Sequence, residues 1–470
     1  MINEAVHVSG EKYSLAIING TAVTERGKMR TNIYIRGEKI ERITQEVLSA
    51  DEIIDASGKF VLPGMIDGHV HFMDPSEPQR EDFITGTRAA AAGGVTTVIE
   101  HTHSSPVRNL DEYEKKLELV KKKSLIDFGL TAHVWDNNHD ELGKLWKAGV
   151  NMFKMFTATT HGVPGMSNSQ ILSVLRTISS FGGIVLVHCE DESITAANEK
   201  VLKDSGYSGN EVVYLWRSRE AELAAINTVS MMASITGAKT IIAHASHVKA
   251  IETARKWGRV GSNLYVETCP QYLYLGEDEV LEKGAFRKFT PPARIRSNFE
   301  KNAMWDQLNN GNITHVSTDH APSTIKQKED NIWGAPFGLP GVETTLSMLL
   351  NGVSMGFLSL ERVSELTSTL PARIYSMYPK KGFLGIGGDA DMVIVDMNAK
   401  KEIRREDIFS KAGWSPYEGM TITGIPQTTI SRGKVIYSNG KIIGKPGYGI
   451  KIPGPGDLRK MNENKNKAGL

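Results

Sequence analysis

The sequence predicts an α/β fold: a (β/α)₈ TIM barrel with a small β-sandwich domain formed from both termini. Segments in which apolar and polar residues alternate, as in β-strands, occupy residues 15–60 and recur after Gly385. Between these stretches, short apolar runs alternate with longer helical segments, which is the pattern of a βα repeat. A chain of 470 residues also has room for one large and one minor domain.

The first segment, residues 1–60, is expected to begin the β-sandwich domain. LAIINGTAV (residues 15–23) and NIYIRGEKIERI (residues 32–43) alternate apolar and polar residues around Asn-Gly and Arg-Gly turns. Such turns favour antiparallel pairing of the strands that they connect.

Residues 61–384 are expected to form the barrel, because they contain eight apolar runs of strand length. One run precedes His69. The other seven are VTTVIE (95–100), LTAHVW (130–135), MFKMF (152–156), GIVLVH (183–188), KTIIAH (239–244), NLYVET (263–268) and ITHVST (313–318).

Residues 385–450 are expected to complete the β-sandwich domain. DMVIVD (391–396) and SRGKVIYSNGKII (431–443) are strand-like, and the second contains an Asn-Gly hairpin turn. The tail, residues 451–470, is polar and rich in Gly, Pro and Asn, which predicts an extended arm or disorder.

Composition excludes several classes of function. The formal net charge is +1, with 55 Lys plus Arg against 54 Asp plus Glu and no long basic run, so nucleic acid is not an expected partner. Cys189 and Cys269 are too few for a disulfide framework, and the N-terminus lacks an apolar signal core, which together predict a cytoplasmic protein. Without a run of about 18 apolar residues, no membrane span is expected.

Two histidines two residues apart, His69 and His71, end the first apolar run. Side chains two apart on a strand share a face, so both imidazoles can reach one metal ion. For an isolated pair, two satisfied polar groups at the rim of the barrel explain the pattern equally well.

Later runs carry potential ligands near their C-terminal ends, where barrel enzymes build their sites. Each has a structural alternative: an ion-paired lysine, a satisfied core histidine, or an aspartate that caps a helix. Four such residues on separate strands, together with the histidine pair, favour one shared metal site. They are Lys154, His188, His244 and Asp319.

Lys154 needs a chemical change before it can bind a cation, because an ammonium group with a reference pKa of about 10.4 is not a ligand. The apolar setting of MFKMF favours the neutral amine, which can react with carbon dioxide to give a carbamate. The two oxygens of a carbamate can bridge two ions roughly 3.5–4 Å apart.

The sequence resembles the amidohydrolase superfamily, and within it the cyclic amidohydrolases that include hydantoinase (dihydropyrimidinase), allantoinase and dihydroorotase. The resemblance covers nearly the whole chain. It is carried by GMIDGHVHF (64–72), TGTRAAAAGGVTTVIE (85–100), FKMF, VHCE, ETCPQYLYL (267–275), FTPPAR (289–294), STDHAP, GLPGVETTL (338–346), GDADMVIVD (388–396) and GWSPYEG (413–419).

The resemblance implies a binuclear metal-dependent hydrolase that opens the amide bond of a cyclic ureide or imide. It implies two divalent ions bridged by carbamylated Lys154, with zinc as the default and manganese, cobalt or iron as alternatives. One ion would be held by His69, His71, Lys154 and Asp319, and the other by Lys154, His188 and His244.

The resemblance also implies roles in catalysis and substrate binding. Asp319 would take a proton from the attacking hydroxide and pass it to the departing nitrogen. Thr290 and backbone groups around Gly338 and Gly341 would hold the imide of the ring.

Two positions depart from the relatives. Hydantoinases usually have a tyrosine five residues after the bridging lysine, and Thr159 stands there. Dihydroorotases usually have an arginine two residues after the second histidine, and Met73, which cannot pair with a carboxylate, stands there. We therefore expect a small neutral ureide as the substrate, with Met73 lining its pocket, and leave the subfamily open.

Two alternatives to this function are a dihydroorotase and a non-catalytic scaffold protein related to dihydropyrimidinase. Such scaffolds typically lack several metal ligands, whereas all six positions are filled here.

The chain is expected to form a homodimer or homotetramer. Pocket lining or local networks are expected for His101, His103, His133, His161, His247 and His320, whereas Glu190 and Glu267 either orient ligands or serve as surface or capping residues.

Overall fold

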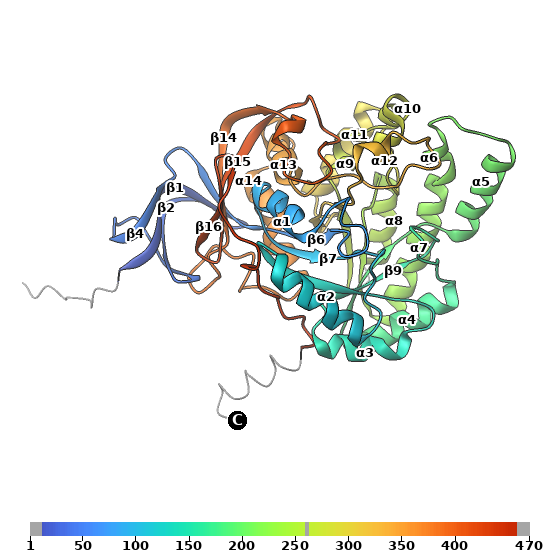
Figure 1. Cartoon of the computed structure of the whole chain (residues 1–470), viewed down its shortest axis with the longest axis horizontal. Coiled ribbons are helices and arrows are strands. Elements are labelled where there is room, and N and C mark those ends of the chain that lie inside the picture. Colours follow the sequence, from blue (N-terminus) through green and yellow to red (C-terminus); the bar gives the residue numbers. More distant parts are fainter. Residues whose placement is uncertain (1–11, 259–262, 458–470) are drawn as a thin grey trace, which may run out of the picture.

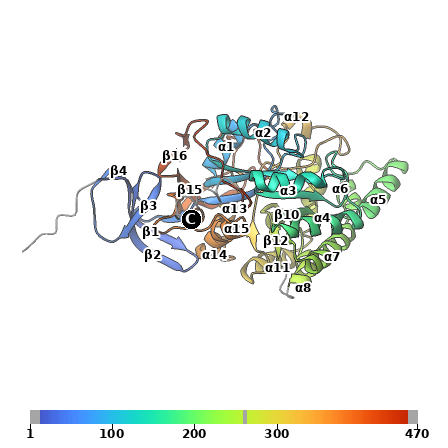
Figure 2. The ribbon, with the colours of Figure 1, turned by 90° about the horizontal axis from the view of Figure 1, so that it is seen from below.

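The computed structural model describes residues 12–258 and 263–457, which form a barrel and a separate sheet (Figures 1 and 2). The barrel has eight parallel strands that are neighbours in sequence order. They are β6 (Met65–Val70), β7 (Val95–Glu100), β8 (Asp127–His133), β9 (Met152–Phe156), β10 (Ile184–His188), β11 (Lys239–Ile242), β12 (Leu264–Thr268) and β13 (His315–Val316).

The barrel is nearly closed between its first and last strands. Val70 of β6 bridges His320, and the N–H of His71 donates to the carbonyl of His320 at 2.7 Å. Every residue of β7, β9 and β10 is buried, because helices cover the outside and packed side chains fill the inside. The predicted barrel is confirmed, although β8 begins three residues before its predicted run.

Helices surround the barrel and follow its strands (Figures 1 and 2). Most begin at a side-chain cap; Asp82, for example, forms a capping box at the start of α1. An excursion of α5 and α6 stands between β10 and α7. The α-helices are α1 (Phe83–Ala92), α2 (Leu110–Lys123), α3 (His139–Ala148), α4 (Asn168–Ser180), α5 (Glu192–Asp204), α6 (Val212–Trp216), α7 (Arg219–Thr236), α8 (Val248–Gly258), α9 (Gln271–Tyr274), α10 (Glu277–Lys283), α11 (Asn298–Asn309), α12 (Ile325–Lys328), α13 (Thr345–Ser354), α14 (Leu360–Ser364) and α15 (Leu370–Ile374).

Strands from both ends of the chain form the second sheet, as predicted. Their hydrogen bonds make one continuous sheet, in the order β17-β16-β15-β14-β5-β1-β2-β3, with β4 also paired to β1. The antiparallel pair β5–β14 joins the two ends. The strands are β1 (Tyr13–Thr24), β2 (Gly27–Arg36), β3 (Lys39–Thr44), β4 (Ala50–Asp55), β5 (Phe60–Pro63), β14 (Met392–Glu402), β15 (Thr421–Ser431), β16 (Lys434–Ser438) and β17 (Lys441–Ile442).

The predicted Asn-Gly hairpin lies between β16 and β17. Asn439 and Gly440 have φ angles of 46° and 81°, which are the positive values that a tight hairpin turn requires. The predicted domain boundaries, at residues 60/61 and 384/385, stay a prediction, and β5 spans the first of them.

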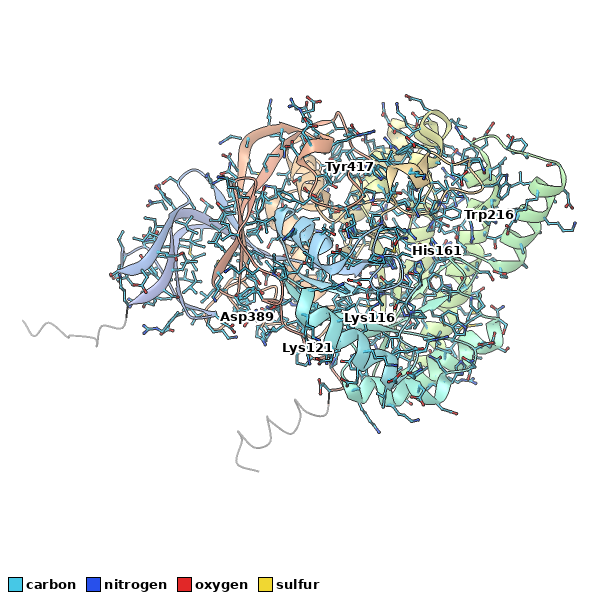
Figure 3. The ribbon with its side chains drawn as sticks, in the orientation of Figure 1. Lys116, Lys121, His161, Trp216, Asp389 and Tyr417 are labelled. Carbon is cyan, nitrogen blue, oxygen red and sulfur yellow. The ribbon has the colours of Figure 1, made fainter. Side chains whose placement is uncertain are left out.

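A buried ionic cluster joins the terminal sheet to the barrel, at the boundary where Figure 3 labels Asp389. The ammonium group of Lys381 lies 2.6 Å from Asp391 and 3.0 Å from Asp389, and it also contacts Asp127 of β8. Although burial opposes the charge, these carboxylates raise the pKa of Lys381 above its usual value. The three aspartates are close enough together to suggest a cation site, but Lys381 already supplies the cation.

The start of the predicted tail lies along the barrel. The N–H of Ile452 donates to the carbonyl of Phe128 at 2.7 Å, and the N–H of Phe128 donates to the carbonyl of Ile450 at 3.0 Å. Residues 458–470, the rest of the predicted arm, lie outside the described residues. Among the described residues, no helix is both long enough and apolar enough to cross a membrane.

Candidate metal centre

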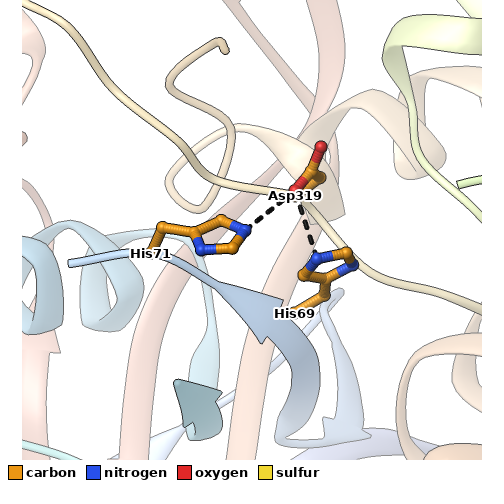
Figure 4. A group of neighbouring side chains, drawn as sticks. All are labelled: His69, His71 and Asp319. Carbon is orange, nitrogen blue, oxygen red and sulfur yellow. Dashed lines mark hydrogen bonds and ion pairs between the residues drawn. The ribbon is translucent and has the colours of Figure 1, made fainter. Parts of the chain in front are cut away.

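His69, His71 and Asp319 meet at the C-terminal end of the barrel (Figure 4). One oxygen of Asp319, Oδ1, lies 3.3 Å from Nε2 of His69 and 3.2 Å from Nε2 of His71. The two histidines come from the end of β6, where the strand period puts them on one face. Their ligand atoms lie close enough to Asp319 to hold a single metal ion.

Lys154, His188 and His244 lie beside this group. Nζ of Lys154 is 3.0 Å from Nε2 of His69, and the rings of His69 and His244 stack with their centroids 5.6 Å apart. Nδ1 of His188 is 3.1 Å from Nε2 of His244. The structure therefore brings the six predicted ligands together from five barrel strands.

The outward nitrogens of three of these histidines are held by oxygen atoms. Nδ1 of His69 lies 2.9 Å from Glu267, and Nε2 of His188 lies 2.8 Å from Glu190. Nδ1 of His71 lies 3.1 Å from the carbonyl of His101. Metal-ligating histidines almost always donate their second N–H to such an oxygen, which orients the ring.

The charge state of the histidines also suits a cation. Burial lowers the pKa of His69, His188 and His244, so their rings are neutral. With the outward nitrogen of His69 and His188 protonated toward a carboxylate, the inward nitrogen carries a lone pair. Nε2 of His244, 3.1 Å from Nδ1 of His188, either donates its N–H to that lone pair or, in the other tautomer, offers a second lone pair to the same cation. The donor set therefore fits metal ions.

Lys154 is buried at 1% exposure, and burial lowers its pKa to about 8. Its ammonium position lies 5.2 Å from the centre of the Phe156 ring. Among the residues that the structure describes, no carboxylate forms an ion pair with it. This is the apolar environment that favours a neutral amine.

Three residues at the strand ends adopt positive φ angles: Met73 at 57°, His244 at 36° and Asp319 at 48°. Residues other than glycine rarely adopt this conformation, which costs energy and is concentrated at functional sites. Here it turns the backbone sharply beyond the strands, and two of the three residues, His244 and Asp319, are predicted ligands.

Asp67 is a buried residue at the site that the sequence reasoning missed. Its Oδ1 accepts hydrogen bonds from the backbone N–H groups of His69 and Thr318, so it ties the first and last strand ends together. Burial raises its pKa to about 7. The signal was present, because Asp67, His69 and His71 follow the same two-residue period.

Arg217 is the second residue that was missed, and it has no local signal in the sequence. It lies just after α6, and its guanidinium donates to Glu190 at 3.2 Å, to the Thr160 hydroxyl at 3.3 Å and to the Thr159 carbonyl at 3.0 Å. It therefore connects the carboxylate beside His188 to the loop that follows Lys154.

The other histidines form local networks, as expected. His101 lies 2.7 Å from the carbonyl of Gly68, and His133 lies 2.9 Å from the carbonyl of His101. His247 faces the carboxylate of Glu222 at 3.4 Å. Nδ1 of His320 accepts a hydrogen bond from the N–H of Gly341 at 3.1 Å.

A row of rings leads away from the metal ligands. The ring centroid of His103 lies 4.9 Å from that of His71 and 4.4 Å from that of His161, on which it stacks. The ring of Phe337 meets that of His161 edge-on, with the centroids 6.1 Å apart. Trp216 of α6 follows at 5.4 Å from Phe337; Figure 3 labels His161 and Trp216. The row of rings therefore begins at His71, one of the predicted ligands.

The predicted substrate residues lie around the same end of the barrel. The hydroxyl of Thr290 donates to Glu190 at 2.7 Å, whereas Met73 is almost fully buried. The N–H of Gly338 donates to the carbonyl of Lys288 at 3.0 Å, and the N–H of Gly341 donates to Nδ1 of His320 at 3.1 Å. Gly338 has a φ of 116°, and a Cβ there would lie 2.2 Å from the carbonyl oxygen of Ala321.

Comparison with known proteins agrees with this geometry. Residues 60–436 match the model of the Amidohydrolase family. The chain is 34% identical to a dihydroorotase of Methanosarcina acetivorans, over 96% of this chain and 97% of that protein. It is 34% identical to an allantoinase of Desulfitobacterium hafniense, over 92% and 97%.

Solved structures show the same relationship. The L-hydantoinase (dihydropyrimidinase) from Arthrobacter aurescens superimposes with a TM-score of 0.90 at 30% identity, over 94% of this chain and all of that one. Fold, family match and relatives agree over nearly the whole described chain. The protein therefore belongs to the amidohydrolase family, among the cyclic amidohydrolases.

Proposed function

We propose that this chain is a binuclear metal-dependent hydrolase that opens the amide bond of a neutral cyclic ureide or imide. The observation that carries the proposal is the convergence of four buried histidines, Lys154 and Asp319 at one end of the barrel. Relatives named hydantoinase and allantoinase support this class of ring.

Two ligand sets share Lys154 in this proposal. When bound, the ions supply a water of lowered pKa and polarise the ring carbonyl. Mixed imidazole and oxygen ligands suit zinc, and also manganese, cobalt or iron. His69, His71, Lys154 and Asp319 would hold one ion, and Lys154, His188 and His244 the other.

Lys154 enters both sets as a carbamate. Its pKa of about 8 leaves a fraction of the amine neutral near pH 7, and the neutral nitrogen adds to carbon dioxide with loss of one proton. The resulting carboxylate-like group has two oxygens, so it could take part in both ligand sets.

Asp319 moves the proton. Its Oδ1 faces His69 and His71, and its side chain is 15% exposed, so the carboxylate also borders the open side of the site. It takes the proton that the attacking water loses and gives it to the ring nitrogen as the C–N bond breaks.

Thr290 and the turn at 338–341 form the cradle for the ring. The N–H groups of Gly338 and Gly341 already donate to other partners, so they are not available to a ring carbonyl. The carbonyl oxygens of this turn can instead accept a hydrogen bond from a ring N–H. The Thr290 hydroxyl, which donates to Glu190, can accept a hydrogen bond from the opposite side.

A neutral ring is favoured because the buried arginines near the site are already engaged. Arg80 donates to Pro322 and Glu77 at 2.9 Å, and Arg294 donates to the carbonyl of Arg217. Met73 offers no positive charge. A buried substrate carboxylate without a partner costs several kcal/mol.

The deciding experiment compares catalytic efficiency on hydantoin, dihydrouracil, allantoin and dihydroorotate with metal-replete enzyme. We expect at least one neutral ring to be opened more efficiently than dihydroorotate. Dihydroorotate turned over at least about ten times better than every neutral ring would support the dihydroorotase alternative. No turnover of any ring by metal-loaded protein would support the scaffold alternative.

The assembly of the protein is part of the proposal. We propose a homodimer or homotetramer, and light scattering that gives the monomer mass of 51.7 kDa at micromolar concentration would overturn it. The cytoplasmic location also stays a prediction.

A further inference from the structure

Two buried lysines without carboxylate partners stand beside the ring cradle. Lys288 and Lys328 are 2% and 1% exposed. Among the described residues, neither forms an ion pair. Lysines are almost never fully buried unless they are paired, so the partners of these two ammonium groups need an explanation.

Backbone carbonyls of one short segment supply those partners. Nζ of Lys288 donates to the carbonyls of Ile332 at 2.6 Å, Trp333 at 3.1 Å and Ala335 at 2.6 Å. Its ammonium group also lies 4.5 Å from the centre of the Phe337 ring. The three donors of one ammonium group thus hold residues 332–337 in one conformation.

Lys328, the last residue of α12, completes the arrangement. Its Nζ donates to the carbonyl of Pro336 at 2.8 Å and to that of Lys288 at 3.0 Å. The carbonyl of Lys288 also accepts the N–H of Gly338 at 3.0 Å. The backbone and the side chain of Lys288 therefore both bind the segment that leads into the turn at 338–341.

Lys288 stands two residues before Thr290. On the proposed function, Thr290 is one half of the ring cradle and the turn at 338–341 is the other. The two halves are separate in sequence. Lys288 belongs to the segment that carries Thr290, and it binds the segment that leads into the turn at 338–341. The ammonium group makes four of the contacts between the two segments, to three carbonyls and the Phe337 ring. Without it, Lys288 would keep only the hydrogen bond from the N–H of Gly338 to its own carbonyl.

We propose that Lys288 is a positioning residue, which fixes the distance between the two halves of the ring cradle through the carbonyls of residues 332–335. It touches neither the reacting atoms nor a metal ligand. Its contribution is the same before and during the reaction, so its loss should weaken substrate binding more than turnover. This inference rests on the proposed function.

The test uses Lys288→Met, which keeps the length of the side chain but removes its three donors. For a neutral ring that wild type opens, we expect KM to rise about tenfold while kcat changes less than about threefold. Lys288→Arg keeps a charge and donors, and should recover part of the KM. Lys381→Met is the matched control: it removes a buried lysine of the ionic cluster far from the cradle, and should lower stability without changing KM.

A second measurement does not depend on activity. Hydrogen exchange of the peptide that covers residues 329–341 should speed up in Lys288→Met and stay unchanged in Lys381→Met. If wild type opens no ring, the proposed function fails, and exchange alone then decides whether Lys288 holds this segment. If Lys288→Met does not fold, Lys328→Met should give the same split between KM and kcat. An unchanged KM, or an equal loss in kcat, overturns the proposal.

Discussion

Oε2 of Glu190 lies 2.8 Å from Nε2 of His188 and 2.7 Å from the hydroxyl of Thr290. One carboxylate oxygen thus contacts a proposed metal ligand and a proposed substrate residue. Burial opposes its charge, but Arg217 and His188 hold the pKa of Glu190 at about 2, so it is ionised.

Glu190→Gln should weaken metal binding, because it removes the charge that orients His188 and makes its ring a better ligand. Loss of such a partner typically costs 10–100-fold, so we expect about that decrease in affinity for the weaker ion. Competition with a chelator measures it. Glu118→Gln, an exposed ion-paired glutamate of α2, is the control and should bind metal as wild type does. Equal affinity in all three proteins would remove Glu190 from this role.

Metal content tests the bridge at Lys154. Reconstituted wild type should hold about two divalent ions per chain. Lys154→Ala should lose most metal and activity, and added short carboxylic acids should restore part of both by occupying the bridging position. Elemental analysis at saturation decides the first point, and one tight ion in wild type would contradict the shared lysine.

Asp319→Asn should remove the proton carrier while keeping the size of the side chain. We expect the rate to fall by about 10²–10⁴-fold, the range typical of losing general acid–base catalysis. Steady-state rates must be compared at matched metal content, because Asp319 is also a proposed ligand. Retained turnover with full metal occupancy would assign proton transfer to another group.

Glu343 predicts a pH dependence of stability. Burial raises the pKa of its carboxyl group to about 8, although the N–H groups of Phe409 and Ser410 donate to it. The unfolded chain releases this proton near pH 4.5, so between about pH 4.5 and 8 the folded state binds more protons. Its contribution to stability therefore falls as pH rises through this window.

Glu343→Gln should flatten this dependence, because the amide does not titrate. Urea unfolding of both proteins at pH 5 and pH 8.5 measures the effect. We expect the wild type to lose on the order of a few kcal/mol more than the variant between these pH values. Identical changes in midpoint would show that Glu343 ionises normally in the folded protein.

The sequence was sufficient for features that depend on local period. His69 and His71 share a face because they stand two apart on a strand, and Lys154 is buried because apolar residues surround it in MFKMF. The same period would have found Asp67. The Asn439–Gly440 turn was likewise readable, because few other dipeptides adopt two successive positive φ angles.

Features that depend on contacts between distant segments could not be predicted from the sequence. Arg217 reaches Glu190 from the end of α6, and nothing near it in the sequence indicates that contact. Lys288 and Lys328 look like ordinary surface lysines in sequence, since their partners are backbone carbonyls whose positions only the fold determines. The parallel pairing of β4 with β1 was missed for the same reason.

The ionic cluster around Lys381 constrains when the protein can finish folding during synthesis. Asp127 lies in the third barrel strand, yet its partner Lys381 is 254 residues later in the chain, and Arg432 is later still. Until both emerge from the ribosome, the carboxylate of Asp127 must remain hydrated, because burying it alone is too costly. We therefore expect the end of the barrel where β8 begins to pack only when the chain is almost complete, and nascent chains that stop before Lys381 to expose it to chaperones.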